Sequence, residues 1–300
     1  MQAMSKLYFP AVRLLAAPTG GGSSSRTSTV ETMDLLRVLI LAFVQGLTEF
    51  LPISSDGHLL VASALFEAAG GAPLEGKQLT LTIVLHAGTL GTVLVVFRRQ
   101  LLQLLTADRR VVPLLIVGTV PVGVLGLALE KWCEPLLESP LAAGLGLIVT
   151  GLVLLWSTRH APSATETQRT YQQLTYGQAA LIGVFQAVAA LPGISRSGST
   201  IAAGLALCGL RRSDAANFSF LLSVPAIGGV VFVKLVQLWR DGSGAGHDVG
   251  HLAIGAGVSF LVGLAALKWL LSWLRHGKLH YFAWWCIPLG TAVTAWQLAK

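Results

Sequence analysis

Two short stretches hold most of the side chains in this sequence that could do chemistry. One runs Gln45-Gly-Leu-Thr-Glu-Phe-Leu-Pro-Ile-Ser-Ser-Asp-Gly-His58, and the other runs Gln186-Ala-Val-Ala-Ala-Leu-Pro-Gly-Ile-Ser-Arg-Ser-Gly-Ser-Thr200. Each passes from apolar sequence through a proline into a loop of serine and glycine, then back into apolar sequence. Ionisable side chains are costly in hydrocarbon, so those within apolar segments usually face a cavity and have a function there. The two stretches therefore predict two loops that share one polar site.

The first stretch has the residue types of a metal-assisted catalytic site. Gln45 and Glu49 are four residues apart, so they lie on one face of a helix. Their side-chain oxygens suit a hard divalent cation such as Mg²⁺ or Ca²⁺. Ser55 and His58 follow at a spacing that fits a nucleophile and its base. We predict Glu49, Ser55 and His58 as catalytic residues and Glu49 with Gln45 as metal ligands, although His58 as a helix-capping residue is an open alternative.

The second stretch has the residue types of an anion site. Its small residues leave backbone N–H groups free to point at an anion, and a helix expected to begin near Ser199 adds the positive end of its dipole. Arg196 matches phosphate oxygens with a planar fork of donors; the alternatives are an arginine at the membrane interface or one paired with a carboxylate. Arg196 is also predicted as catalytic, which makes the site one for phosphoryl transfer inside a membrane. The predicted phosphate-binding residues are Ser54, Ser195, Arg196, Ser197 and Gly198.

The elements that must position these loops are membrane helices. The chain has 300 residues, of which 53% are hydrophobic and 12% charged, whereas about a quarter of the residues of a soluble domain are charged. Apolar windows long enough to cross a bilayer recur along the whole chain. The net charge of +7 comes from basic residues at the ends of these segments, as membrane orientation requires. We therefore predict an all-α polytopic membrane protein and exclude nucleic acid as a partner.

The apolar sequence divides into ten segments that form two sets of five. A crossing needs about 20 residues, so the second segment of each set is too short and pairs with the first as a re-entrant hairpin. This leaves about six transmembrane helices and two re-entrant helical hairpins. The segments are 35–51, 57–69, 79–97, 112–130, 141–156, 176–191, 198–208, 216–238, 252–274 and 281–298.

The two sets align as an internal repeat at an offset of about 140 residues, as in many transporters. Gln45 aligns near Gln186, and Pro52 near Pro192. Three crossings in each half would invert the second half relative to the first. The arginines between 98 and 110 place that loop in the cytoplasm, and we expect the site to face the outer side. The predicted units are a flexible or spurious extension (1–33), a first repeat (34–160), a cytoplasmic linker (161–175) and a second repeat (176–300).

Both motifs resemble those of the undecaprenyl-diphosphatase, or bacitracin-resistance, family of bacterial membrane phosphatases. The resemblance covers about residues 34–300 and includes Asn217-Phe-Ser-Phe-Leu-Leu-Ser-Val-Pro225. It implies six crossings and two re-entrant hairpins in inverted repeats, a divalent cation, and the catalytic roles given above for Glu49, Ser55, His58 and Arg196, with the nucleophile left open between Ser55 and His58. Gln45 departs from the pattern, since some members have Glu there.

The resemblance also implies a substrate and a place in the cell. The substrate would be a polyisoprenyl diphosphate, hydrolysed to the monophosphate and phosphate in the bacterial inner membrane. That reaction recycles the lipid carrier of peptidoglycan synthesis, supports cell wall biogenesis and cell shape, and confers resistance to the antibiotic bacitracin. The rival interpretation is a secondary transporter or lipid flippase, because inverted repeats and broken helices are typical of transporters. The residues of the two loops favour the enzyme, and the sequence leaves a homodimer undecided.

Overall fold

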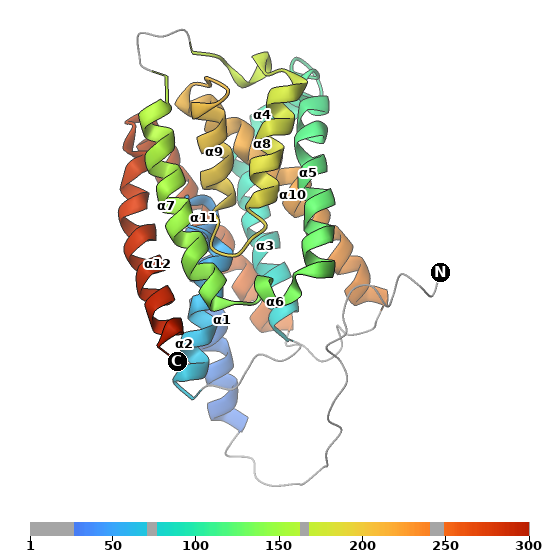
Figure 1. The fold of residues 1–300 in the computed structure, drawn as a ribbon. Helices are drawn as coiled ribbons and strands as arrows, with labels where there is room; N and C mark the ends of the chain where they lie inside the picture. The colour runs from blue at the N-terminus through green and yellow to red at the C-terminus, as the bar shows by residue number, and fades with distance from the viewer. Residues whose placement is uncertain (1–26, 71–76, 163–167, 241–248, 300) are drawn as a thin grey trace.

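The computed structural model describes residues 27–70, 77–162, 168–240 and 249–299, and within these ranges the chain is helical (Figure 1). The predicted all-α polytopic class is confirmed. Helix α1 begins at Thr27, so the end of the extension predicted over 1–33 is helical, while residues 1–26 lie outside the described part. The helices are α1 (Thr27–Phe50), α2 (Ser55–Ala68), α3 (Lys77–Val96), α4 (Arg98–Leu104), α5 (Val111–Trp132), α6 (Glu134–Leu137), α7 (Pro140–His160), α8 (Tyr176–Val188), α9 (Arg196–Ala206), α10 (Arg212–Arg240), α11 (Val249–Arg275) and α12 (Ala283–Leu298).

Within the described ranges, three helices are long and apolar enough to cross a membrane: Pro140–His160, Arg212–Val236 and Val249–Arg275. A fourth crossing is available if α3 and α4 form one span, with a bend of 75° between them. The apolar part of α5 is shorter, at Val111–Gly126, and α12 has 16 residues. The predicted crossings by α5 and α12 therefore stay predictions.

The two predicted hairpins enter the bundle from opposite ends, and their turns meet near its middle (Figure 1). A Cβ added at Gly57 would lie 2.9 Å from the Cα of Gly193, so the turns are in direct contact. Gly193 has φ +80°, and a side chain there would clash with the Ala143 carbonyl, so both its conformation and its packing require glycine. The Ser197 hydroxyl donates to the Leu51 carbonyl at 3.3 Å and joins the turns again.

The first helix of each half of the chain packs mainly against a helix of the other half. The first helix of the first half, α1, packs mainly on α11, and the first helix of the second half, α8, packs mainly on α5. The last helices of the halves, α7 and α12, pack on each other. This arrangement is what the predicted repeat requires, because each hairpin is then held by the long helices of the other half.

Connections rich in arginine meet at one end of the bundle. An isolated bridge joins Arg169 to Leu210, Gln172 donates to the Asp108 carboxylate at 3.3 Å, and the Tyr171 N–H donates to Asp214 Oδ1 at 3.2 Å. We call this the basic end; its arginines are Arg98, Arg99, Arg109, Arg110, Arg159, Arg169, Arg211, Arg212 and Arg275.

A buried tyrosine gives the basic end a pH-dependent stability. Burial, together with the carboxylates of Asp108 and Asp214, raises the pKa of Tyr171 to about 12, from an ordinary value of about 10. The folded protein therefore holds this proton more tightly, and the stability is fully present below about pH 10 and falls as the pH rises toward 12. We expect Tyr171→Phe to lower stability by about 1 kcal/mol at pH 8 and to flatten the decline above pH 10. Thermal unfolding in detergent at both pH values tests this; an equal decline in both proteins would contradict it.

Candidate active site

An ion pair between the two turns forms the centre of the site. Glu49 lies in the last turn of α1, and Arg196 is the first residue of α9. Glu49 Oε1 and Arg196 Nη2 are 2.6 Å apart, with the two side chains 4% and 17% exposed. The two residues are far apart in sequence, so their pairing depends on the meeting of the hairpins. Arg196 therefore pairs with a carboxylate, which the sequence analysis gave as an alternative to phosphate binding. The pair lies in the same site as the predicted phosphate-binding residues.

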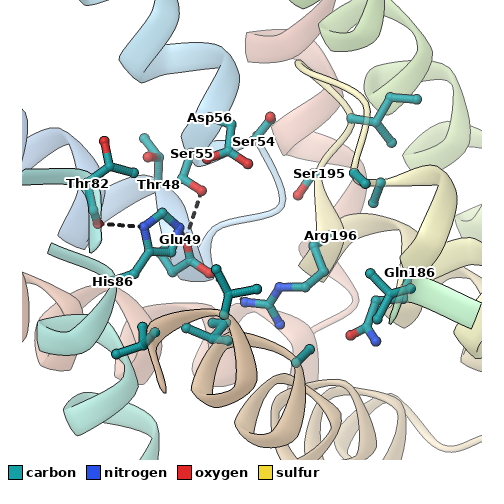
Figure 2. Close-up of a pocket in the computed structure, with 18 of the residues that line it drawn as sticks. Thr48, Glu49, Ser54, Ser55, Asp56, Thr82, His86, Gln186, Ser195 and Arg196 are labelled. Carbon is teal, nitrogen blue, oxygen red and sulfur yellow. Dashed lines mark hydrogen bonds and ion pairs between the residues drawn. The ribbon is translucent and has the colours of Figure 1, made fainter. Parts of the chain in front are cut away.

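The other oxygen of Glu49 collects three further side chains. Ser55 Oγ donates to Oε2 at 2.8 Å, and Gln45 Nε2 donates to the same atom at 3.0 Å. His86 Nε2 lies 3.6 Å from it, while His86 Nδ1 donates to the Thr82 carbonyl at 2.8 Å. Figure 2 shows Ser55 and His86 converging on Glu49. A serine hydroxyl whose proton points at a carboxylate is arranged for deprotonation.

The site lies in a cavity of about 320 Å³, a size typical of small-ligand sites. The cavity extends away from the basic end, because Lys234 lines it and lies 22 residues after the start of α10, or about 33 Å along that helix. Apolar side chains from α3, α5 and α10 form much of the wall. The polar lining residues are Thr48, Glu49, Ser54, Ser55, Asp56, Thr82, His86, Gln186, Ser195, Arg196 and Lys234.

Among the predicted phosphate-binding residues, the structure separates those that line the cavity from those that join the turns. Ser54 and Ser195 line it, and each also caps a helix by accepting from Gly57 N and Gly198 N respectively. Ser197 is buried between the turns and lies 3.2 Å from Ser195 Oγ. Ser197 and Gly198 are absent from the cavity wall, so the part they play in this structure is to hold the turns together.

The structure does not bring His58 to the cavity. Its Nδ1 donates to the Ser54 carbonyl at 2.7 Å, its Nε2 accepts from Trp285 Nε1 at 2.9 Å, and the two rings are nearly parallel, with centroids 6.2 Å apart. Ser54 has φ +71°, a backbone conformation that is strained for a residue with a side chain. His58 is therefore placed to hold the strained turn that carries Ser55, and both of its nitrogens are already occupied.

This geometry predicts how substitutions of His58 should rank. An asparagine amide can replace Nδ1 as the donor to the Ser54 carbonyl, whereas alanine cannot. We expect His58→Ala to lower turnover by at least about tenfold, the cost of one lost hydrogen bond at the turn, and His58→Asn to recover most of it. Steady-state rates of the two variants test this. An equal loss of turnover in both variants would instead indicate that the imidazole ring acts as the base.

Six polar residues of the cavity wall were not predicted as site residues: Thr48, Asp56, Thr82, His86, Gln186 and Lys234. His86 comes from α3, where the sequence shows an isolated histidine in an apolar segment, one turn after Thr82. Gln186 was noticed only as the repeat partner of Gln45. The available signal was the cost of a polar side chain in a membrane helix, which applies to both but says nothing about where they meet.

The fold and the site define a class: a polytopic α-helical membrane protein with a buried carboxylate–arginine pair between two re-entrant hairpins. Comparison with known proteins narrows this class. The family model described as "Bacitracin resistance protein BacA" matches residues 38–292. The chain therefore belongs to the bacitracin resistance protein BacA family.

Relatives in this family carry the name undecaprenyl-diphosphatase. One from Rhodopirellula baltica is 49% identical over 265 residues, covering 88% of this chain and 99% of its own. Another from Desulfatibacillum aliphaticivorans is 42% identical over 285 residues, covering 87% and 98%. A third from Korarchaeum cryptofilum is 36% identical over 280 residues, also covering 87% and 98%. The likeness includes both loops of the site.

Proposed function

We propose that this protein hydrolyses undecaprenyl diphosphate to undecaprenyl phosphate and inorganic phosphate within the membrane. The observation that carries the proposal is the Glu49–Arg196 ion pair, with the Ser55 hydroxyl hydrogen-bonded to the same carboxylate. This places a hydroxyl nucleophile, its proton acceptor and a guanidinium in one cavity. The names of the relatives support the same reaction.

Each residue of the site has a defined role in this proposal. Glu49 accepts the proton of Ser55 as the hydroxyl oxygen attacks the terminal phosphorus, and the lipid monophosphate leaves. Water then releases phosphate from the serine. Arg196 balances the charge spread over the phosphoryl oxygens, which is the main contribution a protein makes to phosphoryl transfer. Arg196 also begins α9, whose N-terminus favours an anion at the same place.

The predicted Mg²⁺ or Ca²⁺ fits the donor set around Glu49. No cluster of three or more His, Cys, Asp or Glu side chains that could hold a metal occurs in the described part of the chain, but Mg²⁺ commonly uses one or two carboxylates together with substrate phosphates. Gln45 Oε1 is buried and has no hydrogen-bond partner in that same part. Glu49 would hold the cation together with the diphosphate, whereas Gln45, the other predicted ligand, is absent from the cavity wall. When bound, the cation supplies positive charge to the phosphoryl oxygens.

The surroundings of the cavity fit a lipid substrate. Ile83, Val122 and Val230 line it, and apolar walls can accept an isoprenyl chain without specific contacts. Because arginine-rich connections lie on the cytoplasmic side, the cavity would open toward the outer side of the inner membrane.

The transporter interpretation has the fold in its favour but not the site. Inverted repeats and broken helices serve transporters equally well. In this site a serine hydroxyl is hydrogen-bonded to a carboxylate that also forms an ion pair with an arginine. Phosphoryl transfer uses such an arrangement, whereas transport does not need it. All three relatives described above are named for hydrolysis.

A cell-based experiment tests the physiological role. In bacteria depleted of their own activity of this kind, expression of this chain should restore growth and raise bacitracin resistance, whereas Ser55→Ala should do neither at equal membrane abundance. Growth restored equally by Ser55→Ala would contradict hydrolysis through this site.

A further inference from the structure

Gln186 aligns near Gln45 in the predicted repeat, but the surroundings of the two side chains differ. Gln45 donates its amide to Glu49, one helical turn later. One turn after Gln186 the chain has Ala190. The neighbour that binds the amide in the first half is thus replaced by a methyl group in the second.

The Gln186 amide is buried without a protein partner. The residue is 1% exposed and lines the cavity. Neither Nε2 nor Oε1 has a hydrogen-bond partner among the described residues. Buried side-chain amides are nearly always satisfied by protein, water or ligand. An amide with both atoms unused on a cavity wall therefore indicates something bound in the cavity.

Arg196 offers a second unused donor at the same place. Its Nη2 binds Glu49, but its Nη1 is buried and has no partner in the described chain. In the view of Figure 2 the guanidinium lies between Glu49 and Gln186, and both Arg196 and Gln186 line the cavity. The arginine can therefore keep its bond to Glu49 and bind another group with its other nitrogen.

We propose that Gln186 and Arg196 Nη1 together bind a phosphate oxoanion. Both nitrogens donate to phosphoryl oxygens, and Gln186 Oε1 accepts from a protonated phosphate oxygen or a bound water. A charged acceptor makes these hydrogen bonds stronger than neutral ones. The inference rests on the proposed function, in which this oxoanion is either the terminal phosphate of the lipid or the phosphate it releases. Gln186 is then a substrate-binding residue contributed by the second hairpin.

Binding and turnover of Gln186→Met test the proposal separately. Methionine keeps roughly the same volume and removes both unused polar atoms, so the protein should fold with an unchanged or higher Tm. Inorganic phosphate should raise the Tm of the wild type, and this rise should be lost in the variant. The kcat/KM for a long-chain isoprenyl diphosphate should fall by at least about tenfold, as expected for a hydrogen bond to a charged group. A rise in the phosphate inhibition constant would show that the product binds here too, and an unchanged constant would assign Gln186 to the lipid alone.

Two more variants complete the test. Thr294 carries another buried hydroxyl without a partner among the described residues, but it is absent from the cavity wall. Thr294→Val should therefore leave unchanged both kcat/KM and the rise in Tm caused by inorganic phosphate, which we call phosphate protection. Gln186→Glu keeps the size of the side chain and adds a negative charge that repels phosphate. Its kcat/KM should therefore fall further than that of Gln186→Met. Wild-type phosphate protection and kcat/KM in both Gln186 variants would overturn the inference. Phosphate protection that needs Gln186, without hydrolysis by the wild type, would support the inference while refuting the proposed reaction.

Discussion

Glu49→Gln is expected to lower kcat by about a thousandfold, near the middle of the range for loss of a general base. The amide keeps the size of the side chain but cannot take the proton of Ser55, which donates to Glu49 Oε2. Affinity for inorganic phosphate should be kept or increased, because Arg196 loses its competing carboxylate. Single-turnover phosphate release and phosphate-dependent thermal shift measure the two effects independently.

An exposed carboxylate provides the control for this variant. Glu67 lies near the end of α2 and is exposed, so Glu67→Gln should leave kcat within about twofold of the wild type, as surface changes usually do. A kcat for Glu49→Gln within tenfold of the wild type would remove Glu49 from the mechanism.

Arg196→Lys is expected to lower kcat/KM by at least about a hundredfold, although the charge is kept. An ammonium group lacks the planar fork that lets one nitrogen bind Glu49 while another binds phosphate. Arg196→Met should abolish measurable turnover and destabilise the protein by about 3 kcal/mol, because Glu49 would be left buried without its counter-charge. Steady-state kinetics and thermal unfolding measure these losses.

A double variant separates the structural part of this loss from the catalytic part. Glu49→Gln combined with Arg196→Met removes both charges, so its Tm should exceed that of Arg196→Met while activity stays absent. Arg98→Lys, an exposed change at the basic end, should behave as the wild type. A double variant no more stable than Arg196→Met would mean that the stability lost in Arg196→Met does not come from the unpaired charge of Glu49.

The sequence was enough to predict the hairpins and to single out Glu49 and Arg196, whereas their pairing was only an alternative to phosphate binding by Arg196. Proline and serine–glycine loops between apolar segments mark a break in a helix, and each segment length could be compared with the thickness of a bilayer. Glu49, Ser55 and Arg196 were recognisable because acidic, hydroxyl and basic groups are costly in such segments. These predictions depend on local sequence, and the structure places all three side chains in one cavity.

Predictions about which way a side chain points could not be made from the neighbouring sequence. His58 is close to Ser55 in sequence, but its ring is held by Trp285, which lies 227 residues away. His86 instead approaches Glu49, from a helix whose sequence shows only one histidine among apolar residues. Spacing along a chain fixes the face of a helix, but the helix that covers that face is set by the tertiary packing.

The most direct test of the account is release of inorganic phosphate by the purified protein from a long-chain isoprenyl diphosphate in detergent, with Mg²⁺, Ca²⁺ or EDTA. We expect equal amounts of phosphate and lipid monophosphate, formed only with a divalent cation and lost in Arg196→Met. Intact diphosphate recovered from the protein under every cation condition would contradict it, and would favour a protein that binds and moves the lipid.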